Sequence, residues 1–370
     1  MYADRAASGF PETWLFRTDA DHEIGLGHLR RTLSLAQQAK EFGIEPIFIL
    51  KHCDASALTF LSSFQCRAIS IPSWFTLSEE RRWTDEAIES YEATVLVLDI
   101  SHKKTPEDPA ELRNYLRRRQ GVTTCAIDGI GKTQLLDSES DLVDLLVVPY
   151  LGAPDPEPER GLLFGPKYAV FDNGILHCAE EPPSVVEQRS LRLLITAGGS
   201  DPYGVTELAL GAVLHEPECG DLELRVVFGA LFAKERQTQL RANNTRGQKI
   251  TWIDAPSSLC RELSWADVVI SATGLTKYEI TLFGVPAIFI SGDRDQFDAN
   301  RHFAARETGI HLGPIRNVSR SDVANALREL ISSPNLRASM SQRSRSLLDG
   351  RGSNRIVSAI RHEREIRNVT

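Results

Sequence analysis

The sequence lacks the features that mark several common classes of protein. No run of about 18 apolar residues occurs in its 370 residues, so we expect no transmembrane helix. The first residues show no basic region followed by an apolar stretch, and we therefore expect no secretory signal and a cytoplasmic location. The formal charge of −8 argues against a nucleic-acid partner, because surfaces that bind nucleic acid carry a basic excess.

Cysteine is scarce, and the common metal and hydrolase motifs are missing. None of the six cysteines belongs to a CxxC pair, so we expect free thiols in a reducing compartment, without a disulfide framework or a metal site. The HExxH pattern of zinc peptidases and the GxSxG pattern of serine hydrolases are absent. DxD triplets occur at 19–21 and 293–295, but such triplets are frequent by chance, and we expect neither a metal nor a cofactor.

The chain instead contains a regular alternation of short β-branched runs and amphipathic segments. In the first half, strands are expected at 14–17, 45–50, 94–98, 123–127 and 142–148, and helices at 29–42, 78–91 and 109–119. In the second half, strands are expected at 191–197, 222–228, 249–253, 268–270 and 287–290, and helices at 275–283 and 296–307. Strands separated by helices of about 10–15 residues indicate βαβ units and parallel sheets.

Two acidic segments rich in proline, 152–160 and 178–188, interrupt this alternation. We therefore expect an α/β fold with two Rossmann-like domains. The expected boundaries are 1–175 for the first domain, 176–189 for a linker, 190–348 for the second domain and 349–370 for a C-terminal helix. Doubly wound sheets bind ligands at the carboxyl ends of their strands, so we expect the ligand in a cleft between the two domains.

The most specific motif follows the first expected strand and opens the first helix. It reads Arg17-Thr18-Asp19-Ala20 and then Ile24-Gly25-Leu26-Gly27-His28. Gly25 and Gly27 let the backbone turn sharply beside a ligand. His28 falls at the helix N-terminus, where the positive end of the helix favours the neutral imidazole that acts as a base. A glycine turn with an incidental histidine accounts for the same residues.

Three loops in the second half carry residues suited to a phosphorylated ligand. Residues 198–200 offer backbone N–H groups to an anion, although they form neither a Walker loop nor a GxGxxG fingerprint. Residues 273–275 precede a helix whose first turn holds a glutamate, and a carboxylate there accepts hydrogen bonds from both hydroxyls of a ribose. The candidate ligand residues are Gly198, Gly199, Ser200, Thr273, Gly274, Leu275, Glu279 and Gln296. Tight βα turns, a solvated glutamate and a helix cap at 293–295 are the alternative interpretations.

Taken together, these motifs resemble those of the UDP-sugar hydrolases of pseudaminic acid biosynthesis and of the related spore-coat polysaccharide proteins. That group is similar in turn to the lipid-linked N-acetylglucosaminyltransferase of peptidoglycan synthesis. The family pattern R-x-D-A…I-G-x-G-H-x-x-R is matched by Arg17, Asp19, Ala20, Ile24, Gly25, Gly27, His28 and Arg31. Further matches are Gly165–Ala169 for G-P-x-Y-A, Gly198–Asp201 for G-G-[ST]-D, and Ser271, Ala272, Gly274, Glu279 and Gln296 for later segments.

The resemblance implies the GT-B fold and a UDP-sugar substrate. UDP would be held by the second domain, with Glu279 on the ribose and the backbones of 198–200 and 272–276 near the diphosphate. His28 would act as general base on a water that attacks the anomeric carbon, so that UDP leaves with inversion and free sugar is released. The resemblance assigns Asp19 or Arg17 to orienting His28 or closing the site.

The chain departs from the family pattern at four places, all in the half expected to face the sugar. They are a missing Tyr at Asp99–Ser101, Gly129 in a paired-Asp position after Asp128, a missing Asn at 147–150 and a missing Arg at 170–173. A nucleotide-sugar ligand is therefore better supported than water as the acceptor. An inverting GT-B glycosyltransferase, which would allow peripheral membrane association, and a non-catalytic nucleotide-sugar-binding protein stay open as alternatives.

A transferase needs an apolar or basic acceptor surface on its first domain. The apolar candidates are Phe60, Leu61, Phe64, Trp74 and Phe75, although packing in the core accounts for them as well. The sequence leaves open the sugar, the base of the nucleotide and the oligomeric state.

Overall fold

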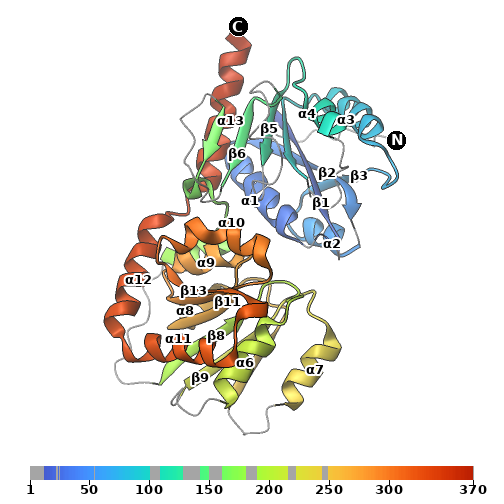
Figure 1. Cartoon of the computed structure of the whole chain (residues 1–370). Helices are drawn as coiled ribbons and strands as arrows, with labels where there is room; N and C mark the ends of the chain where they lie inside the picture. Colours follow the sequence, from blue (N-terminus) through green and yellow to red (C-terminus); the bar gives the residue numbers. More distant parts are fainter. Residues whose placement is uncertain are drawn as a thin grey trace. The chain divides into compact units, whose positions relative to one another are not determined.

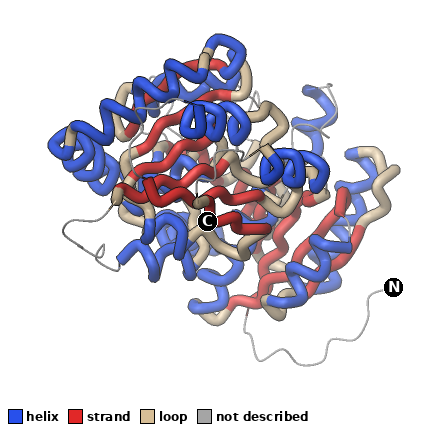
Figure 2. Tube along the Cα trace, turned by 90° about the horizontal axis from the view of Figure 1, so that it is seen from below, coloured by secondary structure: helices blue, strands red, loops and turns tan. Residues whose placement is uncertain are grey.

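The computed structural model describes residues 12–21, 24, 26–53, 55–100, 109–127, 142–149, 161–180, 190–215, 222–243 and 249–369. The chain divides into two compact units, Met1–Asp172 with Arg351–Thr370, and Asn173–Gly350. Each unit has its own parallel sheet with helices around it (Figures 1 and 2). The predicted α/β class with two doubly wound, Rossmann-like halves is therefore confirmed.

The first unit contains a seven-stranded parallel sheet in the order β3-β2-β1-β4-β5-β6-β7. Its strands are β1 (Glu12–Ala20), β2 (Ile44–Cys53), β3 (Arg67–Ser70), β4 (Val95–Asp99), β5 (Thr123–Ile127), β6 (Leu145–Val148) and β7 (Leu162–Phe164). Its helices are α1 (Gly27–Glu41), α2 (Ala55–Ser63), α3 (Leu77–Tyr91), α4 (Pro109–Leu116), the 3₁₀ turn η1 (Pro166–Tyr168) and α13 (Gly352–Val369). Alternate residues of β1 enter opposite apolar layers, Trp14 and Phe16 on one face and Leu15 on the other, as the period of a strand requires.

Helix α13 belongs to the first unit although it follows the second unit in sequence (Figure 1). Its residues Ile356, Val357 and Ile360 are buried in the apolar layer that also contains Trp14. Gly352 lies so close to the backbone of Ala169 that an added Cβ would be 2.0 Å from its carbonyl oxygen. Any larger residue at this position would push α13 away from the unit.

The second unit contains a six-stranded parallel sheet in the order β10-β9-β8-β11-β12-β13. Its strands are β8 (Leu191–Thr196), β9 (Leu222–Phe228), β10 (Ile250–Asp254), β11 (Val268–Ala272), β12 (Ala287–Ser291) and β13 (Gly309–Pro314). Its helices are α5 (Asn173–Glu180), α6 (Val205–His215), α7 (Lys234–Ala242), α8 (Cys260–Trp265), α9 (Thr276–Phe283), α10 (Arg294–Ala304), the 3₁₀ turn η3 (Ile315–Asn317), α11 (Arg320–Ser332) and α12 (Pro334–Leu347). None of the helices that the structure describes combines the length and apolarity needed to span a bilayer.

Two expectations differ from the structure in this unit. The expected linker at 176–189 begins inside helix α5, which packs against α8, and its remainder lies outside the described residues. The expectation of free thiols is wrong for Cys178 and Cys260, which form a disulfide with their Cα atoms 5.8 Å apart. The two cysteines are 82 residues apart, so only the packing of α5 on α8 brings them together. The free cysteines among the described residues are Cys53, Cys66 and Cys125.

Candidate functional site

His28 lies in the first turn of α1, beside the carboxyl end of the neighbouring strand β4. Asp99 is the last residue of β4 and pairs in register with Thr18 of β1. Nδ1 of His28 is 2.7 Å from Oδ1 of Asp99. An ionised carboxylate only accepts hydrogen bonds, so Nδ1 carries the proton and Nε2 keeps the lone pair of a base.

The negative charge of Asp99 is held in place by a buried arginine. Both Asp99 oxygens accept from Arg31, with Nε and Nη2 each at 2.7 Å, in a bidentate pair. Burial opposes ionisation of Asp99, but the charge of Arg31 and the hydrogen bonds from Arg31 and His28 outweigh it and lower the pKa of Asp99 to about 2. Asp99 therefore stays ionised near neutral pH and is able to stabilise an imidazolium at His28.

The contacts described for Arg17 and Asp19 do not include His28, which the resemblance expects them to orient, or whose site it expects them to close. Arg17 donates to Asp19 at 2.7 Å and to Glu80 of α3 at 2.6 Å. Burial opposes the charge of Asp19, but Arg17 reverses the effect, and the pKa of Asp19 lies below its ordinary value. This cluster ties the end of β1 to α3, whereas Asp99 holds the histidine.

The glycines of the first motif are only partly described. Gly27 is the first residue of α1, whereas Gly25 lies outside the described residues, as do Asp128, Gly129 and Tyr150. Leu26 precedes α1 and provides no side-chain cap for the N–H groups of the first turn. The side chain of Leu26 thus leaves the N–H groups of this turn for water, a ligand or another part of the chain.

In the second unit, the loops after β8 and β11 adjoin. Gly198 has a φ of +81°, a conformation that favours glycine, and a Cβ added to it would lie 3.8 Å from Oγ1 of Thr276. A Cβ added to Gly199 or to Gly274 would meet nothing within 4 Å. Open space therefore lies in front of both loops, as a bound ligand requires.

The helices that follow these two loops differ in the hydrogen-bond partners of the N–H groups in their first turns. Asp201 caps α6, because its carboxylate accepts from the N–H groups of Gly204, Val205 and Thr206 at 2.9–3.1 Å. Helix α9 begins after Leu275, which provides no side-chain cap. The N–H groups of Lys277 and Tyr278 in this turn donate to the carbonyls of Gly274 and Leu275, whereas those of residues 274–276 make no backbone hydrogen bond within the described residues. The candidate donors for an anion are therefore the N–H groups of residues 274–276 and those of the 198–200 loop.

Glu279 and Gln296 lie on the helices that follow β11 and β12. Glu279 is in the first turn of α9 and half-buried. Oε1 of Gln296 accepts from the N–H of Gly292 at 3.0 Å, which fixes the side-chain amide and leaves its N–H groups and one oxygen lone pair for a ligand. Asp293 caps α10 by accepting from the N–H of Gln296 at 2.7 Å, and the helix-cap interpretation of this loop is confirmed for Asp293.

Sequence reasoning missed two residues near these sites. Asp99 entered the sequence analysis only through the missing Tyr at Asp99–Ser101, and its pairing with His28 depends on β1 and β4 being neighbours. Lys277 stands in the middle of the 273–279 motif and is buried. The only signal that the sequence offered is a lysine in the first turn of an expected helix, directly after the candidate residues 273–275.

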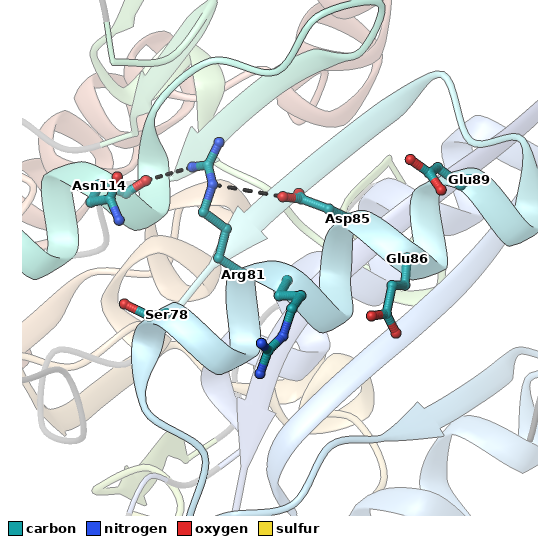
Figure 3. A pocket seen from close by; sticks show the side chains of 7 residues that line it. Ser78, Arg81, Asp85, Glu86, Glu89 and Asn114 are labelled. Atoms are coloured by element: carbon teal, nitrogen blue, oxygen red, sulfur yellow. Dashed lines mark hydrogen bonds and ion pairs between the residues drawn. The ribbon is translucent and has the colours of Figure 1, made fainter.

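A surface pocket of about 350 Å³ lies on α3 of the first unit (Figure 3). Arg81 at its wall pairs with Asp85 at 3.7 Å and donates to the carbonyl of Asn114 on α4. None of the candidate residues lines this pocket. Among the residues described, no group of three or more His, Cys, Asp or Glu side chains is arranged to hold a metal ion.

Two doubly wound units, with candidate residues at the carboxyl ends of the strands in each, define the GT-B class of folds. Solved structures of similar fold extend over nearly the whole chain. MurG of Acinetobacter baumannii has a TM-score of 0.67 at 13% identity and covers 95% of this chain and 100% of its own. The UDP complex of S. aureus MnaA has a TM-score of 0.62 at 16% identity and covers 95% and 96%.

No family model matches the chain. Sequence relatives of low identity include proteins of polysaccharide and peptidoglycan synthesis. The spore coat polysaccharide biosynthesis protein SpsG of Bacillus subtilis is 25% identical over 350 residues, 94% of this chain and 98% of SpsG. An uncharacterized protein of Methanocaldococcus jannaschii is 22% identical over 308 residues, and the match spans 81% of this chain and 60% of that protein.

A third relative matches over about half its length. The UDP-N-acetylglucosamine–N-acetylmuramyl-(pentapeptide) pyrophosphoryl-undecaprenol N-acetylglucosamine transferase of Pseudomonas syringae is 25% identical over 182 residues, 48% of this chain and 50% of the transferase. These similarities support the resemblance to the spore-coat proteins and their transferase relatives, and the hydrolase activity stays a proposal.

Proposed function

We propose that this protein is an enzyme that transfers a sugar from a UDP-linked donor to an acceptor hydroxyl, with inversion at the anomeric carbon. The observation that carries the proposal is the His28–Asp99–Arg31 arrangement, in which a buried carboxylate fixes one ring nitrogen and leaves the other as a base. The similarity to an N-acetylglucosamine transferase and the UDP complex of a protein of the same fold support the substrate class.

In the proposed reaction, Nε2 of His28 takes the proton of the acceptor hydroxyl as its oxygen attacks the anomeric carbon. The bond from that carbon to the diphosphate oxygen breaks, and UDP leaves with the electron pair. Asp99 stabilises the imidazolium that forms, and a positioned base of this kind contributes roughly 10²–10⁴-fold to the rate. The N–H groups at the start of α9 offset the charge that develops on the diphosphate, and Glu279 binds the ribose.

An exposed tryptophan favours transfer over hydrolysis. Trp74 lies in the loop that follows β3, at the same edge of the sheet as Asp99, and is 80% exposed rather than packed in the core. The neighbouring Phe75 is half-buried, and its carbonyl accepts from Lys51 at 2.6 Å, which holds the loop against β2. An exposed aromatic ring at this edge suits an acceptor with apolar or sugar surface.

The second candidate function is hydrolysis of the same nucleotide sugar, with water as the acceptor. It is favoured by the match of Arg17–Arg31 to the hydrolase motif. Release of UDP from a panel of UDP-linked amino sugars, followed by NMR with and without candidate acceptors, separates the two functions. UDP release only with an acceptor supports transfer, whereas inverted free sugar formed in buffer alone supports hydrolysis.

The same assay tests the base. His28→Ala is expected to abolish turnover in either reaction, and His215→Ala, at an exposed histidine on α6, is the matched control. Binding of UDP without turnover under any condition would contradict both enzymatic proposals and leave a binding protein.

A further inference from the structure

A buried lysine lies directly under the turn that starts α9. Lys277 is 7% exposed and is the second residue of that helix. Its amine donates to the carbonyl oxygen of Thr273 at 3.3 Å and to Oδ1 of Asn300 on α10. The amine therefore ties the 273–275 turn, one of the candidate diphosphate loops, to the neighbouring helix.

Asn300 extends this contact to the loop after β12. Its Nδ2 donates to the carbonyl oxygen of Gln296 at 2.6 Å, and Oε1 of Gln296 accepts from the N–H of Gly292 at 3.0 Å. Lys277 thus stands at one end of a chain of hydrogen bonds that joins the loops after β11 and β12. A change at its amine reaches both loops.

The charge of Lys277 has no counter-charge in the part of the chain that the structure describes. Its amine makes no ion pair there and lies 4.8 Å from the ring centre of Tyr278 and 5.5 Å from that of Phe303. Burial lowers the pKa of Lys277 to about 7. A cation in the first turn of a helix is also disfavoured by the positive end of the helix dipole.

Among the described residues, the titratable groups around Lys277 do not compensate its charge. His311 of β13 is neutral near pH 7, because burial and the charge of Lys277 lower its pKa to about 4. Helix α10 presents the uncharged Asn300 and Phe303. At the far end of α9, Arg345 of α12 donates to the carbonyl of Phe283. On α8, which also packs on α9, Glu262 is paired with Arg225 at 3.0 Å.

We propose that Lys277 is the positioning residue of the nucleotide site and takes up a proton from solvent when a nucleoside diphosphate binds at the start of α9. The inference rests on the proposed function, since it names the group whose positive charge compensates the negative charge of the ligand. Bound phosphates supply the anion that the neutral site lacks, and an anion nearby favours the ammonium form of a buried amine. The protonated amine in turn holds the Thr273 carbonyl and keeps the N–H groups of the turn directed at the ligand.

Calorimetry with UDP-N-acetylglucosamine tests the proposal, because its diphosphate diester does not titrate near neutral pH. Titrations at pH 8 in two buffers of different ionisation enthalpy give the number of protons taken up. We expect about one proton per nucleotide for the wild type, and affinity that falls roughly tenfold from pH 7.5 to pH 8.5. The Lys234→Met variant, at an exposed lysine of α7, is the matched control and is expected to behave like the wild type.

Two variants separate this role from a structural one. Lys277→Met is expected to bind more weakly, with no proton uptake and a flat pH profile. Asn300→Asp places a carboxylate beside the amine, so Lys277 is already protonated and proton uptake falls to near zero in a folded protein. Tight binding by the wild type without proton uptake, or uptake that persists in Lys277→Met, overturns this inference alone. Failure of the wild type to bind uridine nucleotides overturns the proposed function together with it.

Discussion

The two units differ in how the charged groups near the ends of their strands are paired. In the first unit, the buried charges around His28 are paired, with Asp99 on Arg31 and Asp19 on Arg17. In the second unit, Lys277 has no carboxylate partner among the described residues, and α9 starts without a side-chain cap. The charges of the first unit are therefore paired without a ligand, whereas we propose that a bound ligand supplies the missing charge in the second unit.

From this difference we expect different roles for the two sites. Paired charges fix the direction of a base and cost nothing to reorganise during a reaction. Unpaired donors and an uncompensated amine favour an anion that brings its own charge. Substitutions in the first unit are thus expected to reduce catalysis or stability, and those in the second unit to reduce nucleotide affinity.

The largest effect is expected from Asp99→Asn. The amide no longer stabilises a charged imidazole, and Arg31 is left buried without its counter-charge, so turnover is expected to fall by about 10²–10⁴-fold. Steady-state rates of UDP release measure the loss, and calorimetry checks that UDP still binds. Turnover within a few-fold of the wild type would show that Asp99 does not hold the base.

Arg17→Met tests the second buried pair of the first unit. It leaves Asp19 buried without its cation, whereas Glu80 keeps Lys51 at 2.9 Å, and breaking a buried pair in this way costs about 3–5 kcal/mol of unfolding free energy. Urea unfolding measures the change. The exposed pair of Arg241 and Asp254 provides the control, because Arg241→Met is expected to cost under about 1 kcal/mol. Equal losses in the two variants would contradict the comparison.

Glu279→Ala tests the proposed ribose contact in the second unit. If the carboxylate binds the ribose, its loss removes charged hydrogen bonds and lowers the affinity for uridine nucleotides by about tenfold to a hundredfold. Calorimetry with UDP measures the change, and Glu235→Ala, in the exposed first turn of α7, serves as control. Unchanged affinity would refute the ribose assignment while leaving the role of His28 untouched.

Acid unfolding gives the smallest expected effect. The pKa of Asp99 is about 2 in the folded protein and 3.8 for an ordinary aspartate, so folding favours the ionised form. Its contribution to stability is present above about pH 4 and is lost as the pH falls toward 2. Between pH 5 and pH 3 we expect the wild type to lose about 1 kcal/mol that Asp99→Asn does not lose. Parallel losses in urea unfolding of the two proteins would contradict the pairing of Asp99.

The sequence was sufficient to predict the parts of the molecule that depend on local pattern. Strand β1 and helix α1 follow from the period of their apolar residues, and the glycines at 198 and 199 follow from the turn that they allow. The α/β class then follows from the order of such elements, because each βαβ unit adds a parallel strand.

The remaining features depend on contacts between distant residues. His28 and Asp99 are 71 residues apart, and Arg17 and Glu80 are 63 apart, so their pairing depends on strand order and helix packing. The Cys178–Cys260 disulfide was missed for the same reason. Lys277 differs, because its position was visible in the sequence, and only its burial and the lack of a counter-charge among the described residues came from the structure.

The return of α13 to the first unit has a consequence for biosynthesis. The ribosome makes residues 1–172 before helix α13, yet the apolar layer around Trp14 needs Ile356 and Val357 from that helix. The second unit, Asn173–Gly350, is continuous and emerges complete before that helix does. The part of the chain made first is therefore the last to acquire its full core, and a nascent chain that stops short of α13 exposes that apolar layer to chaperones and proteases.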